Sequence, residues 1–459
     1  MRAPDLVSAL PLMARALQEL PHVEWQLQRL EIDLDSPGEA LDLPAGFEAN
    51  DIGPRALLGS TWSTVGAVLD HDVQSLARLG DPNNWIAALG WPEEAPELRF
   101  ALHARFDPDR AAAREWSTFG DCRVWLPMLE LDTEARRLAL NWVDRSEEPG
   151  ARTAMTAAME GWRDHSSDRP TGVRSLAWDL APEAKNQWCE QVSRALQRID
   201  DPGAETTMDK IVLARRLDGI LADPVQPADL LRSQTIGANG WPWWIERDGW
   251  SWLGESPELL GSRDDNRLRT IALAGTRPRD ENRLRDEALG QELLACDKDR
   301  REQAAVADWI EGRLQDLTGT PPARGDLELT RLANLQHLSR RLEVRLGPDH
   351  TDRHWIDALH PTPALCGAPR VEVRRWLRQA ESFDRGLYGG LVGWLSRSRA
   401  EVSVAIRGLL MQAQQVSAYA GAGLVRGSDP ELEWNETNAK LGAVCRRLGL
   451  QSPGRKDSA

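Results

Sequence analysis

Residues 418–441 read AYAGAGLVRGSDPELEWNETNAKL, and the character of this stretch changes between its two parts. The first part carries the small residues Gly421 and Gly423, which let a ligand approach backbone N–H groups closely. The second part predicts a helix, because Asp429 is a favourable N-cap residue and Pro430 suits the first helical position. We therefore expect a glycine-lined anion-binding segment that leads directly into a helix.

The predicted helix carries two carboxylates on one face. Glu433 and Glu436 are three residues apart and Lys440 follows Glu436 by four, so the three side chains lie on the same side of the helix. A simpler interpretation is a glycine-rich turn before a solvated amphipathic helix, with Glu436 and Lys440 as an ordinary surface pair. The segment by itself leaves both interpretations open.

The composition predicts a globular protein with an acidic surface. The chain has 459 residues, of which 41% are apolar and 28% charged, and its formal net charge is −15. This charge argues against sequence-independent binding to nucleic acid, which draws on clustered Lys and Arg. We expect no membrane association, since no run of about eighteen apolar residues is present. The start of the chain lacks an uninterrupted signal-peptide core and the five cysteines form no CxxC pair, which favours a cytoplasmic protein without structural zinc or disulfides.

Lysine is rare in this chain and occurs only as Lys185, Lys210, Lys298, Lys440 and Lys456. Because the sequence uses Arg wherever charge alone is needed, a Lys beside an apolar strand is a candidate for chemistry of its titratable amine. Lys210 begins such a strand, in the β-rich run DKIVLARRL. The alternative is a strand-end lysine that extends into solvent.

These features together resemble the chorismate-utilising enzymes, the family of isochorismate, salicylate, anthranilate and aminodeoxychorismate synthases. The likeness is nearly continuous from about residue 206 to residue 448 and weak before residue 200. LHPTPALCGAPR, at 359–370, is among its most specific motifs. The resemblance implies an α+β fold, in which a single large domain of two packed antiparallel β-sheets is surrounded by helices.

The resemblance also predicts how the chain is organised. Residues 1–200 are expected to form the N-terminal half of the scaffold, and residues 201–450 the chorismate-binding catalytic region. Residues 451–459 are expected to be a disordered tail.

Two catalytic roles follow from the resemblance. It implies that Lys210 is the general base and that Glu258 is the general acid, at the end of the predicted hairpin PWWIERDGWSWLGESPELLGS. A lysine base must be neutral near pH 7, so its pKa has to lie well below the free value of about 10.4. Without the family pattern, Glu258 could equally be a charge that ends a strand and faces water.

The resemblance implies a Mg²⁺ cofactor bound by Glu302 and Glu436, with Glu433 as an outer or alternate ligand. Hard oxygen donors of this kind favour Mg²⁺ over zinc. Asp299, one turn before Glu302, is expected to support the ligands from outside. The family commonly has His after the first glutamate, whereas this chain has Gln303, for which we expect altered hydrogen bonding around the metal rather than its loss.

Glu302 lies on a helix predicted from about residue 286 to residue 314. It falls on the same stripe as Val306, where a carboxylate is costly unless it is paired or binds a metal. Pairing with Arg300 or Arg301 is the alternative, although these neighbours point elsewhere around the helix.

Substrate contacts are likewise implied by the resemblance. Arg407, in the predicted strand EVSVAIRGLLMQ, needs a fixed anionic partner, and the family assigns it the pyruvyl carboxylate. Backbone N–H groups at Gly275 and Thr276 are expected to bind the ring carboxylate. The residues implied to contact chorismate are Gly275, Thr276, His337, Ala364, Arg407, Gly421 and Lys440.

The implied reaction is conversion of chorismate to isochorismate, by water addition at C2 and loss of the C4 hydroxyl, for menaquinone, phylloquinone or siderophore biosynthesis. Isochorismate synthases characteristically have Ala at the position of Ala364, where salicylate-forming and aminating relatives usually have Thr. A salicylate synthase and an aminating anthranilate or aminodeoxychorismate synthase are the alternatives. We expect no obligatory glutaminase subunit. An inactive partner subunit is a third alternative, against which the retention of Lys210, Glu258, Glu302, Arg407 and Glu436 speaks.

Overall fold

The structure is a computed structural model that describes most of the chain from residue 27 to residue 453. The described residues are 27–33, 55–58, 62–73, 76–88, 97–132, 137–143, 174–201, 207–232, 240–331 and 335–453.

Strands dominate the fold, and every pairing between the described strands is antiparallel. They are β1 (Leu27–Asp33), β2 (Arg55–Leu58), β3 (Trp62–Asp72), β4 (Arg99–Ala104), β5 (Cys122–Asp132), β6 (Arg137–Val143), β7 (Leu176–Trp178), β8 (Lys210–Leu221), β9 (Trp241–Arg247), β10 (Trp250–Ser256), β11 (Leu259–Asp264), β12 (Arg267–Pro278), β13 (Ala323–Arg331), β14 (Leu335–Arg345), β15 (Gly367–Ala368), β16 (Leu391–Ser396), β17 (Arg399–Val404), β18 (Gly408–Gln412) and β19 (Gln415–Leu424).

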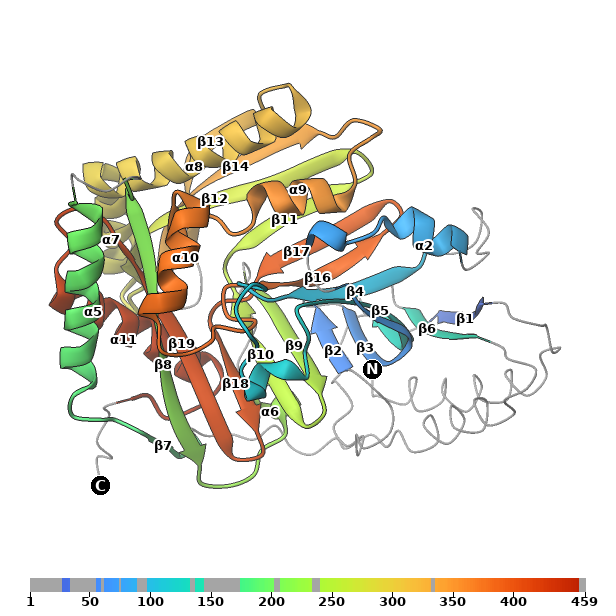
Figure 1. Ribbon diagram of the computed structural model, residues 1–459, viewed down its shortest axis with the longest axis horizontal. Coiled ribbons are helices and arrows are strands. Elements are labelled where there is room, and N and C mark those ends of the chain that lie inside the picture. Colours follow the sequence, from blue (N-terminus) through green and yellow to red (C-terminus); the bar gives the residue numbers. More distant parts are fainter. Residues whose placement is uncertain are drawn as a thin grey trace.

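Helices surround these strands and gather at the end where β8 and β12 lie, on the left in Figure 1. They are η1 (Leu76–Arg78), α2 (Pro82–Ala88), α3 (Arg114–Ser117), α5 (Ala184–Ile199), α6 (Pro227–Arg232), α7 (Arg283–Ala295), α8 (Asp297–Thr318), α9 (Asp352–Leu359), α10 (Arg370–Ala380) and α11 (Pro430–Arg447). Among the described helices, none is both long and apolar enough to cross a membrane.

Strand pairing links β8, β19, β18, β10 and β9 into one layer and β4, β16, β17, β11, β12 and β14 into the other. A core of aromatic side chains joins the two layers. Trp252 of β10 and Tyr419 of β19 are fully buried, and their ring centroids lie 5.9 Å apart in an edge-on arrangement. They pack with Val392 of β16 and Ala101 of β4, which come from the opposite layer. Such aromatic pairs add about 0.5–1.5 kcal/mol beyond the burial of their area. The expected α+β fold of two packed antiparallel sheets with surrounding helices is therefore confirmed.

Several local predictions are also confirmed. β8 begins at Lys210, as the DKIVLARRL run predicts. β9 and β10 form a hairpin whose turn residues Asp248 and Gly249 have φ values of 49° and 74°, which suits a tight two-residue turn. Asp429 caps α11, because its Oδ1 accepts hydrogen bonds of 2.9 Å from the N–H groups of Glu431 and Leu432.

The helix predicted from residue 286 to residue 314 is two helices. The backbone of Cys296 is extended, with φ −72° and ψ 111°, and this residue ends α7 and begins α8. Asp297 and Asp299 fall in the first turn of α8, where negative charge meets the positive end of the helix dipole. These two acidic residues therefore mark the start of a new helix. The prediction followed the apolar periodicity, which continues across this break, and so gave one helix.

The strand predicted around Arg407 is also interrupted. β17 ends at Val404 and β18 begins at Gly408, and Arg407 lies between them with φ 63°. A left-handed conformation is strained for a residue with a Cβ and is found preferentially at functional positions. The carbonyl of Arg407 accepts a backbone hydrogen bond from Glu255, which fixes this connection against β10.

Strands from the first 200 residues pair directly with strands from the later part of the chain. β4 pairs with β16 along its whole length, and β2 pairs with β9. Of the tail expected from residue 451, Gln451 donates a backbone hydrogen bond to the carbonyl of Arg174, and residues 454–459 lie outside the described residues.

Candidate active site

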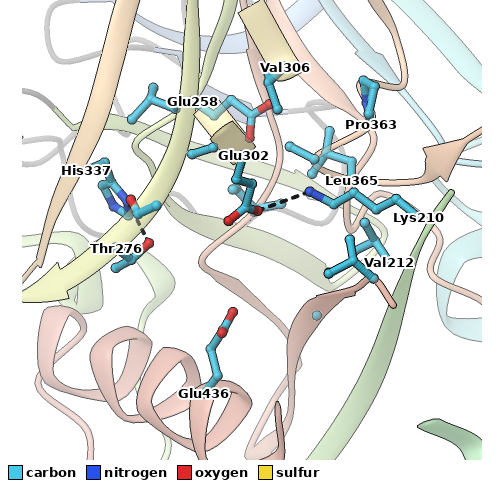
Figure 2. A pocket seen from close by; sticks show the side chains of 18 of the residues that line it. Lys210, Val212, Glu258, Thr276, Glu302, Val306, His337, Pro363, Leu365 and Glu436 are labelled. Atoms are coloured by element: carbon cyan, nitrogen blue, oxygen red, sulfur yellow. Dashed lines mark hydrogen bonds and ion pairs between the residues drawn. The ribbon is translucent and has the colours of Figure 1, made fainter. Parts of the chain in front are cut away.

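A single cavity of about 730 Å³ opens between the ends of β8, β12, β14 and β19 and the helices α8 and α11. Every residue that the sequence predicted for the site lines it. These residues are Lys210, Glu258, Gly275, Thr276, Asp299, Glu302, His337, Ala364, Arg407, Gly421, Glu433, Glu436 and Lys440. Figure 2 shows Lys210, Glu302 and Glu436 among them, whose side chains point toward one another.

Lys210 projects from the start of β8 toward helix α8. Its Nζ donates a hydrogen bond of 3.2 Å to Oε1 of Glu302, and Glu436 points toward the same carboxylate from α11 (Figure 2). Gly423 of β19 makes room for this lysine, because a Cβ at that position would lie 2.9 Å from Cε of Lys210. The glycine in the 418–424 run therefore has a role that the sequence did not predict.

The side chain of Glu302 is more exposed to solvent than its position on the apolar stripe of the helix predicted. Its side chain is 40% exposed, whereas Val306, one turn later, is buried. The cavity opens over Glu302, so this carboxylate keeps access to water while its apolar neighbours pack into the core. Its partner is Lys210 and not one of the flanking arginines Arg300 and Arg301.

Glu258 follows β10 at the edge of the cavity. Oγ1 of Thr362 donates a hydrogen bond of 3.2 Å to its Oε1. Burial raises the pKa of Glu258 to about 7, although Thr362, Lys210 and Arg407 act in the opposite direction. A carboxyl group with this pKa is partly protonated near neutral pH, so it can donate a proton.

A bulge in β12 brings Thr276 to His337 of β14. The register shifts between Ala274 and Thr276, and Gly275 has φ 72°, a conformation that favours glycine. Nδ1 of His337 lies 3.0 Å from Oγ1 of Thr276 and 3.2 Å from the carbonyl oxygen of Gly275. Since the carbonyl can only accept, Nδ1 carries the proton.

His337 presents its other nitrogen without a partner. Nε2 is buried and has no hydrogen-bond partner among the described residues. Burial lowers the pKa of His337 to about 3, so the ring is neutral near pH 7. The ring therefore offers Nε2 as a hydrogen-bond acceptor to a group that enters the cavity.

Arg407 lines the cavity with a guanidinium nitrogen that is free to bind a ligand. Its Nη1 is buried without a hydrogen-bond partner among the described residues, and burial lowers the pKa of its guanidinium from the ordinary value. A buried cation is costly unless an anion pairs with it. This arrangement suits a ligand carboxylate, which a guanidinium can bind through two parallel hydrogen bonds.

The carboxylate face of α11 meets the cavity at Glu433, Glu436 and Lys440. Nζ of Lys440 donates to Oε1 of Glu436 at 2.6 Å and to the carbonyl oxygen of Gly421 at 2.7 Å. Burial and the charge of Glu436 raise the pKa of Glu433. Burial also opposes ionisation of Glu436, but Lys440, Arg407 and other cations outweigh it and lower the pKa of Glu436. The two neighbouring carboxylates would thus gain from an added cation.

The donor set fits a hard divalent cation. Glu302 and Glu436 supply carboxylate oxygens from two helices, and each accepts a hydrogen bond from the Nζ of a lysine. In the described part of the chain, no three His, Cys, Asp or Glu side chains form a ready-made metal site. Mg²⁺ needs few protein ligands because it retains several waters or binds ligand oxygens.

Asp299 and Gln303 have other neighbours. Oδ2 of Asp299 accepts a hydrogen bond of 2.8 Å from Nη2 of Arg277, so this carboxylate is already paired at the cavity wall. Gln303 is buried, and its Nε2 lies 3.3 Å from the carbonyl oxygen of Ala272 in β12. Gln303 therefore ties α8 to the strand layer and does not line the cavity.

Sequence reasoning missed Tyr388, Tyr419, Thr362 and Lys298, all but Thr362 of which line the cavity. The two tyrosines are the only ones in the chain, so the rarity argument that singled out Lys210 would have found them too. Thr362 lies within the specific motif LHPTPALCGAPR, which was another available signal.

Comparisons with known proteins identify the family. The family model described as "Chorismate binding enzyme" matches residues 83–449. The chain is 29% identical to isochorismate synthase 2, chloroplastic, of Arabidopsis thaliana, over 92% of this chain and 81% of that protein. It is 30% identical to the salicylate biosynthesis isochorismate synthase of Pseudomonas aeruginosa, over 89% of this chain and 91% of that protein.

A solved structure shows the same fold. The menaquinone-specific isochorismate synthase MenF of Escherichia coli superposes with a TM-score of 0.80 at 28% identity, covering 97% of this chain and 99% of that chain. The match to the family model spans most of the sequence and includes the whole cavity lining. The chain therefore belongs to the family of chorismate-binding enzymes.

Proposed function

We propose that this protein is an isochorismate synthase, which converts chorismate to isochorismate with Mg²⁺. The observation that carries the proposal is that Lys210 and Glu258 face one cavity in which Nη1 of Arg407 is buried with no hydrogen-bond partner among the described residues. An amine, a carboxyl group with a pKa near 7 and an anion-binding site are what this reaction requires.

The reaction exchanges one water for another. Lys210 takes a proton from the water that attacks C2, the ring double bonds shift, and Glu258 donates its proton to the hydroxyl that leaves C4 as water. Arg407 binds the pyruvyl carboxylate, and backbone N–H groups at Gly275 and Thr276 bind the ring carboxylate. Nε2 of His337 accepts a hydrogen bond near the ring.

Glu302 and Glu436 are the residues that would hold Mg²⁺, with Glu433 and Asp299 supporting them. When bound, the ion supplies positive charge that binds and orients the ring carboxylate. Lys440 holds Glu436 in place and ties it to Gly421 through hydrogen bonds of 2.6 and 2.7 Å. Local cations of this kind offset the acidic character of the whole chain for a doubly negative substrate.

The cavity composition favours this product over those of other family members. Ala364 lines the cavity at the position where salicylate-forming and aminating enzymes usually have Thr. Lys210 supports hydration, and we propose no obligatory glutaminase subunit. All five cysteines are free thiols, which supports the cytoplasm as the compartment. We further propose that residues 1–200 support the catalytic region 201–450 through strand pairs such as β4–β16.

Incubation with chorismate and Mg²⁺, followed by chromatography of the products, tests the function. Isochorismate as the product is expected. Salicylate and pyruvate as the main products would assign a salicylate synthase instead. Anthranilate or aminodeoxychorismate formed only with ammonium would assign an aminating enzyme.

Replacing Lys210 by Gln tests the general base. The amide cannot accept a proton, so we expect isochorismate formation to fall by about 10²–10⁴-fold while the protein stays folded and binds chorismate. Lys185→Gln is the matched control, because Lys185 pairs with Glu431 on the surface and should not affect turnover. Near-normal turnover of Lys210→Gln would rule out the base assignment.

The pKa of Glu258 predicts an alkaline limit to activity. The carboxyl group is protonated below about pH 7 and ionises above it, so kcat should fall as pH rises through or above this value. Burial raises the pKa of Glu258 in the folded state from 4.5 to about 7. The contribution of Glu258 to the free energy of unfolding is therefore greatest at low pH and decreases as the pH rises to about 7. Glu258→Gln should remove both dependences, measured by kcat and by thermal midpoint against pH. Persistence of the alkaline limit in the residual activity of this variant would contradict the assignment.

Arg407→Ala should weaken chorismate binding more than it affects folding. A charge-assisted hydrogen bond is worth about 1.5–3 kcal/mol, so KM should rise by roughly one to two decades. The thermal midpoint should hold, because burial of the guanidinium is costly and its Nη1 has no hydrogen-bond partner among the described residues. Arg267→Ala, on the surface beside Glu343, is the control. An unchanged KM with a large loss of thermal stability would indicate a structural role.

Glu436→Gln should abolish Mg²⁺-dependent turnover and leave the fold intact, since it removes one of two charged ligands. We would measure isochorismate formation after chelation and stepwise addition of Mg²⁺, with circular dichroism to verify folding. Glu431 is an exposed residue of the same helix, so Glu431→Gln is the control. Its turnover should respond to added Mg²⁺ as that of the unmodified protein does. Normal activity of Glu436→Gln in the presence of chelator would show that the metal assignment is wrong.

A further inference from the structure

A buried ion pair lies at the wall of the cavity, which one of its two residues, Arg385, lines. Arg385 and Glu381 have side chains that are 4% and 3% exposed. Nε of Arg385 donates to Oε2 of Glu381 at 2.8 Å, and Nη2 donates to Oε1 at 2.5 Å. The guanidinium and the carboxylate thus face each other in the parallel two-bond arrangement that Arg adopts with carboxylates.

The remaining hydrogen bonds of this pair reach two separate segments. Nη2 of Arg385 donates to the carbonyl oxygen of Val212 at 2.7 Å, and Nη1 donates to the carbonyl oxygen of Leu365 at 3.0 Å. Oε1 of Glu381 accepts the backbone N–H of Ala214 at 2.9 Å. The pair therefore clamps β8 to the segment that follows Ala364.

Both clamped segments carry residues of the proposed site. Lys210 is two residues before Val212 on β8, and Ala364 directly precedes Leu365. A short backbone ladder also joins these segments, through the N–H of Val212 to the carbonyl of Cys366, the N–H of Asp209 to the carbonyl of Ala368 and the β8–β15 pairing. Arg385 lies across this junction and reaches a carbonyl on each side.

The geometry is specific to arginine. A lysine has one ammonium group and cannot make the same parallel contacts to Glu381 and two carbonyls at once. The guanidinium also lies over the rings of Phe106 and Tyr388, at 4.4 and 6.0 Å from their centroids. Buried ion pairs are often no more stabilising than apolar groups of similar volume, so stability alone does not account for this one.

We propose that Arg385, held by Glu381, is a positioning residue that fixes Lys210 relative to Ala364 and thereby sets the rate of water addition. This inference rests on the proposed function, in which Lys210 is the base. Arg385 acts through β8, so its loss should affect kcat and leave substrate affinity largely intact.

The test compares Arg385 with a second arginine whose side chain is 10% exposed. Arg385→Lys should lower kcat by about 10–100-fold with KM changed less than about twofold, because a displacement of about 1 Å can cost 10²-fold in rate. Arg263→Lys is the matched control. Arg263 makes a similar two-bond pair with the buried Asp352, at 2.6 and 2.9 Å, and does not line the cavity. Arg263→Lys should lower the thermal midpoint about as much as Arg385→Lys does, and its kcat should equal that of the unmodified protein.

A double variant separates positioning from general stability. In the Lys210→Gln background, Arg385→Lys should cause no further loss of the residual isochorismate formation, because the base it positions is gone. Full multiplication of the two losses would overturn the proposal, as would a kcat of Arg385→Lys equal to that of Arg263→Lys. Glu381→Gln, which keeps the shape of the acceptor, takes the place of Arg385→Lys if that variant does not fold.

Hydrogen exchange gives a readout that does not depend on activity. Backbone amides at residues 210–214 and 365–368 should exchange faster in Arg385→Lys and not in Arg263→Lys. Unchanged exchange there would overturn the clamp. If the unmodified protein formed no isochorismate while exchange responded as expected, the proposed function would fail and the clamp itself would stand.

Discussion

The register between β8 and β19 is the constraint on which the site depends. Ten consecutive pairs run from Gln415 opposite Ile220 to Leu424 opposite Ile211. Because side chains alternate between the two faces of a strand, a shift by one residue would turn each side chain of β8 to the other face. The register places Gly423 opposite Val212 and next to Lys210, and α11 begins at Pro430 shortly after β19 ends. The base, the glycine segment and the carboxylate helix are therefore positioned by one ladder.

Local signals in the sequence predicted the parts of this arrangement that depend on short-range chemistry. Asp429 is a cap residue wherever a helix follows, and Lys210 starts a strand whose apolar pattern is clear. Lysine rarity proved informative, since Lys210, Lys298 and Lys440 all line the cavity. The family resemblance supplied the two-sheet topology, which periodicity alone could not select because it does not encode how distant strands pair.

Features that depend on tertiary context were not predictable. The left-handed backbone of Arg407 arises where β17 passes to β18, and no residue type there demands it. The exposure of Glu302 depends on a cavity that forms only when α8 meets β8 and α11. The buried pair of Arg385 and Glu381 appears in sequence as an ordinary helical spacing, yet its partners are carbonyl groups far away in the chain.

The glycine at 423 has a consequence for how this site tolerates change. A methyl group there would meet the flexible end of the Lys210 side chain and not the backbone, so the fold could absorb it by a rotation of that side chain. The amine would move while the protein stayed stable. The size of the residue at position 423 is therefore limited by the function of Lys210 and not by the stability of the fold. A homologue without the lysine could carry a larger residue in place of the glycine. Substitution of both residues together in a homologue would indicate a protein that still folds but no longer adds water to chorismate.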